Sequence, residues 1–359
     1  MKEEILRILG TVLHPGRDDR NIVELGMVGE IVESPGKVEV TLTFPARRDP
    51  LAEYLAGSAR AALYRELPAG TEIEVRSVAR PKEKKPSVND LTLDGLRNVR
   101  HIVAVASGKG GVGKSTVAVN LAIALSRLGF KVGLADADVY GPSVPIMTGT
   151  VDEIPDAMED NDAGEGRTVI LPIEKYGVKW MSIGYFAKAG QALIWRGPMA
   201  CNALKQMILQ VRWGVLDYLL IDMPPGTGDI HISLVNDIPV EGAVIVTTPQ
   251  AVALSDVEKG IDLFLNENVK KRLFGLVENM AWFTPEELPE NRYYIFGKDG
   301  GASMAARLGI PLLGQIPLVE GIRECGDAGE PVALGSRPDA QAFLDLARRF
   351  AAETEKEGN

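Results

Sequence analysis

Ten residues about a third of the way along the chain constrain its fold more than any other stretch. Residues 107–116 read Ser-Gly-Lys-Gly-Gly-Val-Gly-Lys-Ser-Thr and match the phosphate-binding pattern G-x-x-x-x-G-K-[ST]. An apolar run, 102–106, precedes them, and a helical stretch, 115–128, follows them. Backbone N–H groups of such a loop, together with the helix N-terminus, bind phosphate oxygens. We therefore expect a nucleotide site here rather than an ordinary glycine-rich turn.

The loop supplies side chains for ATP and Mg²⁺, which are the expected cofactors. Lys114 is placed to reach the β- and γ-phosphates, and the Ser115 hydroxyl is placed to ligate Mg²⁺. Lys109 is a second lysine that a phosphate loop does not need. It is either solvated or reaches a phosphate across a two-fold interface in a homodimer. The predicted nucleotide-binding residues of the loop are Gly108, Lys109, Gly110, Gly111, Val112, Gly113, Lys114, Ser115 and Thr116.

From His101 onward, apolar runs alternate with helical stretches. The runs are residues 102–106, 131–135, 178–183, 218–221, 243–246, 274–277 and 312–316. This alternation predicts an α/β fold with a doubly wound, mostly parallel sheet. Nearly continuous apolar strands fit a sheet that is covered on both faces. Ligands of such sheets bind at the carboxyl ends of the strands.

Three aspartates stand at such strand ends. Asp136 and Asp138 follow the run 131–135, and Asp222 ends the run 218–221. Carboxylates there hold Mg²⁺ directly or through water and orient the attacking water, although Asp136 and Asp138 would also serve to cap the loop start. We expect Lys109, Lys114 and Asp138 to be catalytic. The expected metal site consists of Ser115, Asp136, Asp138 and Asp222.

The chain is long enough for two domains, and its composition changes near residue 80. Residues 1–80 look like a small α/β unit, in which Val38, Val40, Leu42 and Phe44 alternate along a strand. Residues 81–98 are predicted to be a linker, because RPKEKKPS is charged and proline-bearing; a solvated loop inside one domain is the alternative. Residues 99–359 then form the ATPase domain. Within it, the acidic residues 150–167 are expected to be an exposed loop or hairpin insertion.

Charge, cysteine content and hydropathy indicate which kinds of partner and which cellular compartment the chain is suited to. The net charge is −10 and the pI about 5.1, which argues against broad binding to nucleic acid. The chain has two cysteines, far apart in sequence, which fits a reducing compartment and no disulfide framework. The N-terminus does not read as a signal peptide, and no apolar stretch of about 18 residues occurs. We expect a cytoplasmic protein with neither a membrane nor a nucleic acid as partner.

Several segments together resemble the Mrp (ApbC) family of iron–sulfur cluster carrier ATPases, in the deviant-Walker group that also holds MinD- and ParA-like proteins. The resembling segments are SGKGGVGKST, DADVYGPSVP, EKYGVKWMSIG, WRGPM, DYLLIDMPPGTGDIHISL, TTPQAVALSDVEKG and GLVENMAWF, within residues 99–335. The combination is specific, because YGPS, DMPPGTGD and ENM are not general phosphate-loop features. The N-terminal unit is similar to the small iron–sulfur-assembly domain that many Mrp proteins carry.

The resemblance implies roles for individual residues. Lys109 would be the signature lysine that acts in trans within an ATP-bridged homodimer, and Asp138 the switch acid near the attacking water. Asp222 would be the acid of the second Walker motif, and Asn279 would lie near the adenine. The implied partners are iron–sulfur apoprotein clients or an assembly scaffold.

One departure from the family pattern concerns the cluster. Family members carry Cys-x-x-Cys shortly after ENM-x-x-F, whereas residues 280–297 here contain no cysteine. In the N-terminal unit, Arg47 stands where a cysteine often follows the strand. A cluster needs about four thiolates, and Cys201 and Cys325 have no nearby cysteine partner in sequence. We leave the cluster ligands unassigned and expect a [4Fe–4S] cluster to be held weakly or not at all.

Three hypotheses follow. The first is an ATP-dependent iron–sulfur cluster carrier or assembly factor. The second is an ATP-gated scaffold or adaptor without a bound cluster. The third is a MinD- or ParA-like positioning ATPase, which the missing basic stripe and the C-terminal sequence ARRFAAETEKEGN do not favour.

Overall fold

The structure is a computed structural model that describes residues 2–15, 20–44, 51–68, 70–79, 93–159, 168–186, 197–267 and 269–356. Contacts divide the chain into two compact units, Met1–Ser87 and Val88–Asn359, and each is described by itself. Much of the segment expected to be a linker lies outside the described residues. Its last part forms the 3-10 helix η2 (Leu93–Leu96), and Leu96 is buried in the core of the second unit.

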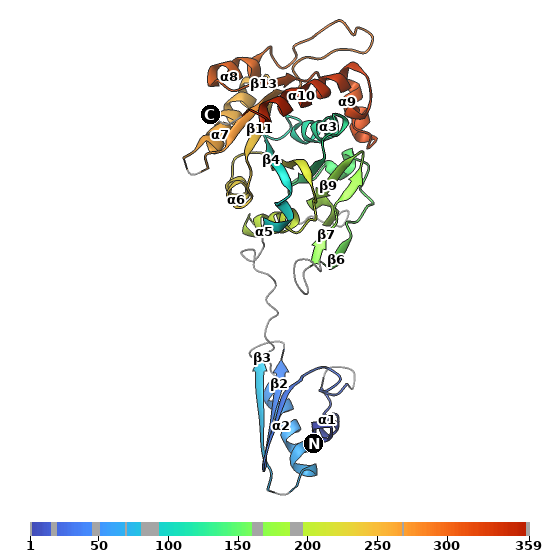
Figure 1. Ribbon diagram of the computed structural model, residues 1–359, viewed down its shortest axis with the longest axis vertical. Helices are drawn as coiled ribbons and strands as arrows, with labels where there is room; N and C mark the ends of the chain where they lie inside the picture. The colour runs from blue at the N-terminus through green and yellow to red at the C-terminus, as the bar shows by residue number, and fades with distance from the viewer. Residues whose placement is uncertain are drawn as a thin grey trace. The chain divides into compact units, whose positions relative to one another are not determined.

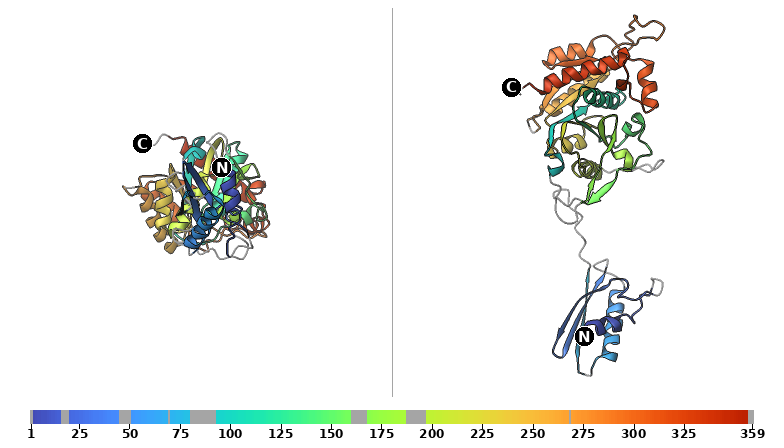
Figure 2. Two further views of the ribbon diagram at one scale, coloured as in Figure 1. Left: turned by 90° about the horizontal axis from the view of Figure 1, so that it is seen from below. Right: turned by 45° about the vertical axis from the view of Figure 1, so that its right-hand side comes forward.

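The first unit is a three-stranded sheet in the order β1-β2-β3, packed against two helices (Figure 2). The sheet pairs β1 with β2 antiparallel and β2 with β3 parallel. The side chains of β2 alternate, and Val38, Val40, Leu42 and Phe44 all point into the core, as the sequence predicts. The elements are α1 (Lys2–Leu9), β1 (Val28–Ser34), β2 (Lys37–Phe44), α2 (Ala52–Glu66) and β3 (Glu72–Ala79).

The second unit is built on an eight-stranded sheet in the order β13-β12-β11-β4-β10-β5-β9-β8 (Figure 1). Neighbouring strands are parallel except β8, which runs antiparallel to β9 at the edge. Each of the seven apolar runs identified in the sequence overlaps one of the parallel strands. The strands are β4 (Val99–Ala106), β5 (Val132–Asp136), β8 (Ile173–Lys175), β9 (Val178–Ser182), β10 (Leu216–Asp222), β11 (Gly242–Thr247), β12 (Arg272–Glu278) and β13 (Leu312–Gln315).

Helices cover both faces of this sheet, and each face has its own hydrophobic core. Helices α3 and α10 pack on one face, and α5, α6, α7 and α8 pack on the other (Figure 1). This arrangement confirms the predicted doubly wound α/β fold. The helices are α3 (Lys114–Arg127), α4 (Val144–Met147), η3 (Ile183–Phe186), α5 (Gly197–Leu209), α6 (Asp229–Asp237), α7 (Ala251–Leu265), α8 (Gly300–Leu308), α9 (Glu320–Asp327), η4 (Val332–Leu334) and α10 (Pro338–Thr354).

The acidic insertion forms a small two-stranded antiparallel sheet, β6 (Ala157–Glu159) with β7 (Thr168–Ile170). The residues between them, 160–167, lie outside the described part of the chain. Within the described ranges, none of the helices is both long and apolar enough to cross a membrane.

Candidate nucleotide-binding site

The loop between β4 and α3 has the strand–loop–helix geometry that the sequence predicts. Two of its glycines are required by space and conformation. Gly113 caps α3 with a φ of +80°, and a Cβ there would lie 2.3 Å from Nδ2 of Asn279. A Cβ on Gly108 would lie 2.3 Å from the backbone carbonyl of Asp256 on α7. The loop is therefore packed closely from two sides, which fixes the direction of its backbone.

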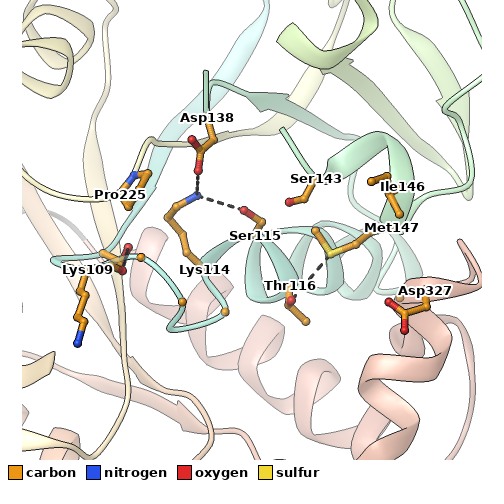
Figure 3. Close-up of a pocket in the computed structure, with 15 residues that line it drawn as sticks. Lys109, Lys114, Ser115, Thr116, Asp138, Ser143, Ile146, Met147, Pro225 and Asp327 are labelled. Atoms are coloured by element: carbon orange, nitrogen blue, oxygen red, sulfur yellow. Dashed lines mark hydrogen bonds and ion pairs between the residues drawn. The ribbon is translucent and has the colours of Figure 1, made fainter. Parts of the chain in front are cut away.

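Lys114 is the centre of a buried charged group (Figure 3). Its Nζ atom lies 2.5 Å from Oδ1 of Asp222 and 3.9 Å from Oδ2 of Asp138. It also donates a 3.2 Å hydrogen bond to the Ser115 hydroxyl. Burial raises the pKa of Asp222, and the Lys114 ammonium opposes that rise. The strand ends thus bring together the residues that the sequence analysis placed at one edge of the sheet.

Asp136 lies beside Asp222 on the neighbouring strand, because β5 and β10 pair these two residues in register. Its carboxylate accepts hydrogen bonds from the Ser182 hydroxyl at 2.9 Å and from the backbone N–H groups of Asp138 at 3.2 Å and Val144 at 3.3 Å. Burial and the charge of Asp222 raise the pKa of Asp136. These bonds hold the turn after β5 in shape, in keeping with the capping alternative for Asp136.

The donor set fits a magnesium ion that is shared with phosphate. Oδ2 of Asp222 is buried and has no hydrogen-bond partner, and the Ser115 hydroxyl lies beside the same carboxylate. Hard oxygen donors of this kind suit Mg²⁺. The described residues contain no group of three or more His, Cys, Asp or Glu side chains that would hold a metal by themselves. A Mg²⁺ ion here therefore needs phosphate oxygens and water to complete its coordination.

Two adjoining pockets lie over this group. The first, of about 350 Å³, is lined by the loop, by Asp138 and by residues that the sequence analysis missed, among them Ser143 and Met147 near α4 and Asp327 on α9. The second, of about 250 Å³, shares Gly113, Thr116 and Met147 with it and extends along α9. The first pocket contains the side chains that are predicted to bind phosphate, and the second is mostly apolar. This combination suits a nucleotide with its base in the second pocket.

Asn279 lies in the wall of the second pocket, at the end of β12. Its side chain is buried, and Nδ2 donates a 2.8 Å hydrogen bond to the carbonyl of Val112. Asn279 therefore ties the phosphate loop to the pocket in which the adenine is expected.

Lys109 behaves differently from Lys114. Its side chain is exposed and points away from Lys114 and Asp138 (Figure 3). None of the described acidic residues forms an ion pair with it. An exposed cation beside the phosphate pocket, directed away from its own site, is the geometry that the two-fold interface prediction requires, although a solvated lysine has it too.

The loop Pro224–Asp229 borders the same site and is tied down at two points. The backbone N–H of Gly226 donates to the Ser107 carbonyl at 3.1 Å, and Nε2 of His231 donates to the Pro224 carbonyl at 2.8 Å. His231 is 4% exposed, and burial lowers its pKa. This buried histidine therefore holds the loop in place by its bond to the Pro224 carbonyl.

The two cysteines are not brought together as a ligand pair. Cys201 is buried in the core under α5, whereas Cys325 lies on α9 and packs against the other core. These helices stand at different ends of the second unit (Figure 1). The structure thus offers no cysteine replacement within one chain for the absent Cys-x-x-Cys.

The parallel sheet, the glycine loop and the lysine–carboxylate group define a P-loop nucleoside triphosphatase. A family model described as "NUBPL iron-transfer P-loop NTPase" matches residues 98–351, and one described as "Iron-sulfur cluster assembly protein" matches residues 2–75. The chain belongs to this family of iron-transfer P-loop ATPases. The resemblance seen in the sequence is thereby confirmed for both units.

Individual relatives agree with the family assignment. An "Iron-sulfur cluster carrier protein" of Synechocystis sp. is 41% identical over 349 residues, which are 96% of each chain. One of Aquifex aeolicus is 47% identical over 271 residues, 73% of this chain and 70% of its own. Among solved structures, a nucleotide-binding protein of Archaeoglobus fulgidus in complex with ADP has a TM-score of 0.59 and 34% identity, covering 72% of this chain and 98% of its own.

A more distant structure shares the fold alone. The MinC:MinD cell division complex of Aquifex aeolicus has a TM-score of 0.50 and 22% identity. The predicted class, a P-loop ATPase, is confirmed by the family.

Proposed function

We propose that this chain is an ATP-hydrolysing iron–sulfur cluster carrier or assembly factor that works as a homodimer. The observation that carries the proposal is the buried Lys114–Asp222 pair, whose lysine lines a pocket of about 350 Å³, in a chain whose relatives are named cluster carriers. The reducing compartment that the cysteine content fits supports a cytoplasmic location.

Each site residue receives a role on this proposal. Lys114 leaves Asp222 and binds the β- and γ-phosphates when ATP enters. Ser115 and Asp222 would hold Mg²⁺, which would neutralise phosphate charge. Asp138, 3.9 Å from Lys114, orients the attacking water. Asp136 supports Asp222 and shapes the turn rather than meeting the metal directly, because its carboxylate already accepts three hydrogen bonds.

The homodimer is supported by Lys109. Its exposed ammonium has no described partner and lies beside the phosphate pocket. A second subunit would place this cation on the phosphates of the facing site, where it stabilises the charge that develops during hydrolysis. Dimerisation is then linked to ATP, because the facing phosphates attract the lysine only when ATP is bound.

The iron–sulfur cluster is cargo in this proposal, delivered to apoprotein clients or received from an assembly scaffold. Cys201 is buried in the core, and Cys325 stands alone on α9. Four clustered thiolates are therefore not available in one chain, and any cluster is held briefly or with other ligands.

The missing thiolates also favour a second candidate, an ATP-gated scaffold or adaptor that binds partners without ever holding a cluster. Iron and acid-labile sulfide, measured per dimer after anaerobic reconstitution and gel filtration, separate the two. The carrier proposal expects a labile, substoichiometric cluster that transfers to an apoprotein acceptor.

The Cys201→Ser, Cys325→Ser double variant serves as the matched control and is expected to keep its ATPase activity. A stable, stoichiometric [4Fe–4S] cluster that vanishes in this variant would show that the two cysteines replace the usual pair. Complete absence of iron under all conditions would leave the scaffold as the function.

A further inference from the structure

A groove of about 640 Å³ lies on the second unit outside the phosphate pocket. One wall is the segment 282–292, which follows β12 and is the stretch in which the sequence lacks the expected cysteine pair. The other walls are the start of α9 and the start of α10. Neither the described nucleotide-binding loop nor the three strand-end aspartates line this groove.

The floor of the groove is apolar and preformed. Backbone hydrogen bonds hold the wall in place: Phe283 and Tyr293 exchange bonds of 2.8 and 2.9 Å, and the N–H of Leu318 donates to the Trp282 carbonyl at 2.7 Å. The lining combines apolar and polar side chains in about equal measure, and a concave, ordered surface of this kind is typical of a ligand site. Its apolar residues are Trp282, Phe283, Pro285, Pro289, Pro317, Val319, Pro338 and Ala342.

The rim of the groove has an excess of negative charge. Two arginines line it, and both are already engaged. The guanidinium of Arg292 lies 4.2 Å above the ring of Trp282, and Arg337 pairs with Asp339 at 2.9 Å. The five carboxylates of the lining are Glu286, Glu287, Glu320, Glu324 and Asp339. Glu320 and Glu324 pair with Arg323 on the same helix, at 3.3 and 3.1 Å, so the unpaired charge is that of Glu286 and Glu287.

Arg337 is fixed by its surroundings: it neutralises Asp339 and lies within the electrostatic reach of Glu286. Its guanidinium lies directly on the α9 backbone at Gly321, where any Cβ would collide with it. Glu286 and Glu287 are exposed, and neither forms an ion pair with any residue that the structure describes. Two carboxylates without an ion-pair partner among the described residues therefore line the groove beside its apolar side chains.

We propose that this groove binds a basic, extended segment of a partner protein. Its lysine or arginine side chains pair with Glu286 and Glu287, and its apolar side chains lie on the floor between Trp282 and Val319. Charge complementarity with the two unpaired glutamates argues for a basic segment of a different protein, and the test below distinguishes it from a second copy of this chain. The inference goes beyond the proposed function and does not depend on a bound cluster.

The test uses the full-length chain and a displayed library of random dodecapeptides. We expect the enriched peptides to have an excess of lysine and arginine. Binding of a selected peptide, measured by fluorescence anisotropy, should weaken about tenfold in the Glu286→Gln, Glu287→Gln double variant, since two exposed charge contacts are lost. Glu290→Gln is the matched control, because Glu290 lies in the same segment and does not line the groove.

The ATPase rate of both variants should equal that of the parent chain, which separates this inference from the nucleotide-site assignment. Enrichment of neutral or acidic peptides, or no enrichment, would refute the proposal. Equal binding by the double variant and the parent would refute it as well. A loss of self-association in the double variant would identify a second copy as the occupant instead.

Discussion

Nζ of Lys114 lies 2.5 Å from Oδ1 of Asp222, and both side chains are buried. The two residues are 108 positions apart in sequence and meet because the phosphate loop and β10 end at the same edge of the sheet. A buried ammonium and carboxylate stabilise each other only as a pair. On the proposed function, an incoming triphosphate would replace Asp222 as the partner of Lys114, and Mg²⁺ would compensate the charge of Asp222.

Replacing Lys114 should abolish hydrolysis. In Lys114→Ala the β- and γ-phosphates lose their cation, so we expect turnover to fall by about 10²–10³-fold or more. Steady-state phosphate release, from protein freed of contaminating ATPase, measures it. Lys259→Ala is the control, because that side chain is 70% exposed on α7. Parent-like turnover in Lys114→Ala would show that the loop is not the catalytic site.

Lys109 should act only through the partner subunit. Lys109→Ala is expected to bind ADP normally and to lose ATP-dependent dimerisation and hydrolysis. Asp138→Ala, which blocks hydrolysis, should accumulate the dimer with ATP in sedimentation experiments. Lys131→Ala, at another exposed lysine, controls for loss of surface charge. Unchanged hydrolysis and assembly in Lys109→Ala would rule out the role in trans.

The stability of the protein should fall as the pH rises through the titration of Asp136. Burial and the charge of Asp222 raise the pKa of Asp136 from 3.8 to about 7. Between these values the folded state keeps a proton that the unfolded state has released, so the free energy of unfolding decreases with pH, by at most about 1.4 kcal/mol per pH unit. Urea unfolding at pH 5 and pH 7 measures this slope.

Asp136→Asn should flatten that dependence, although it also loses acceptor bonds and is less stable at each pH. Asp152→Asn, at an exposed aspartate, should keep the slope of the parent chain. If Asp136→Asn has the same slope as the parent, another group causes the dependence.

Asn279 should contribute to nucleotide affinity rather than to chemistry. Asn279→Ala removes the 2.8 Å bond to the Val112 carbonyl and one wall of the second pocket. We expect ADP affinity, measured with a fluorescent analogue, to fall about tenfold. Asn291→Ala, at an exposed asparagine, should bind ADP as the parent does. Unaltered affinity in Asn279→Ala would place the base elsewhere.

His231 should position the loop Pro224–Asp229. Its Nε2–H bond to the Pro224 carbonyl is lost in His231→Leu, and we expect kcat to fall about tenfold while KM for ATP changes little. His231→Gln supplies an amide donor and should restore most of kcat. Equal losses in the two variants would indicate a packing role only.

The strands and the strand-end aspartates could be predicted because each depends on neighbouring residues in the sequence: a short apolar run predicts a strand, and the aspartates follow such runs directly. Seven apolar runs predicted seven parallel strands. Because ligands of such sheets bind at the carboxyl ends of the strands, Asp138 and Asp222 were expected near Lys114, where the structure places them. The edge strand β8 has three residues, too few to show a period. The chemical roles assigned to these residues stay predictions until the variants are measured.

Features made by tertiary packing could not be predicted. Met147 and Asp327 reach the phosphate pocket from α4 and α9, two short helices without a motif of their own. The acidic groove combines three segments that the sequence separates, and no periodicity connects them. The burial of His231 likewise depends on how the loop after Asp222 folds back on α6.

Helix α9 lies between the second pocket, in which the base is expected, and the acidic groove. Ile322 and Arg323 line the pocket, whereas Glu320 and Glu324 line the groove. None of its residues is fully buried, so moving this helix disturbs few core contacts. Thermodynamic linkage is reciprocal: if the nucleotide shifts α9 and changes the affinity of the groove, the occupant of the groove changes nucleotide affinity by the same factor. A client protein would then control nucleotide occupancy from a distance, without touching a phosphate.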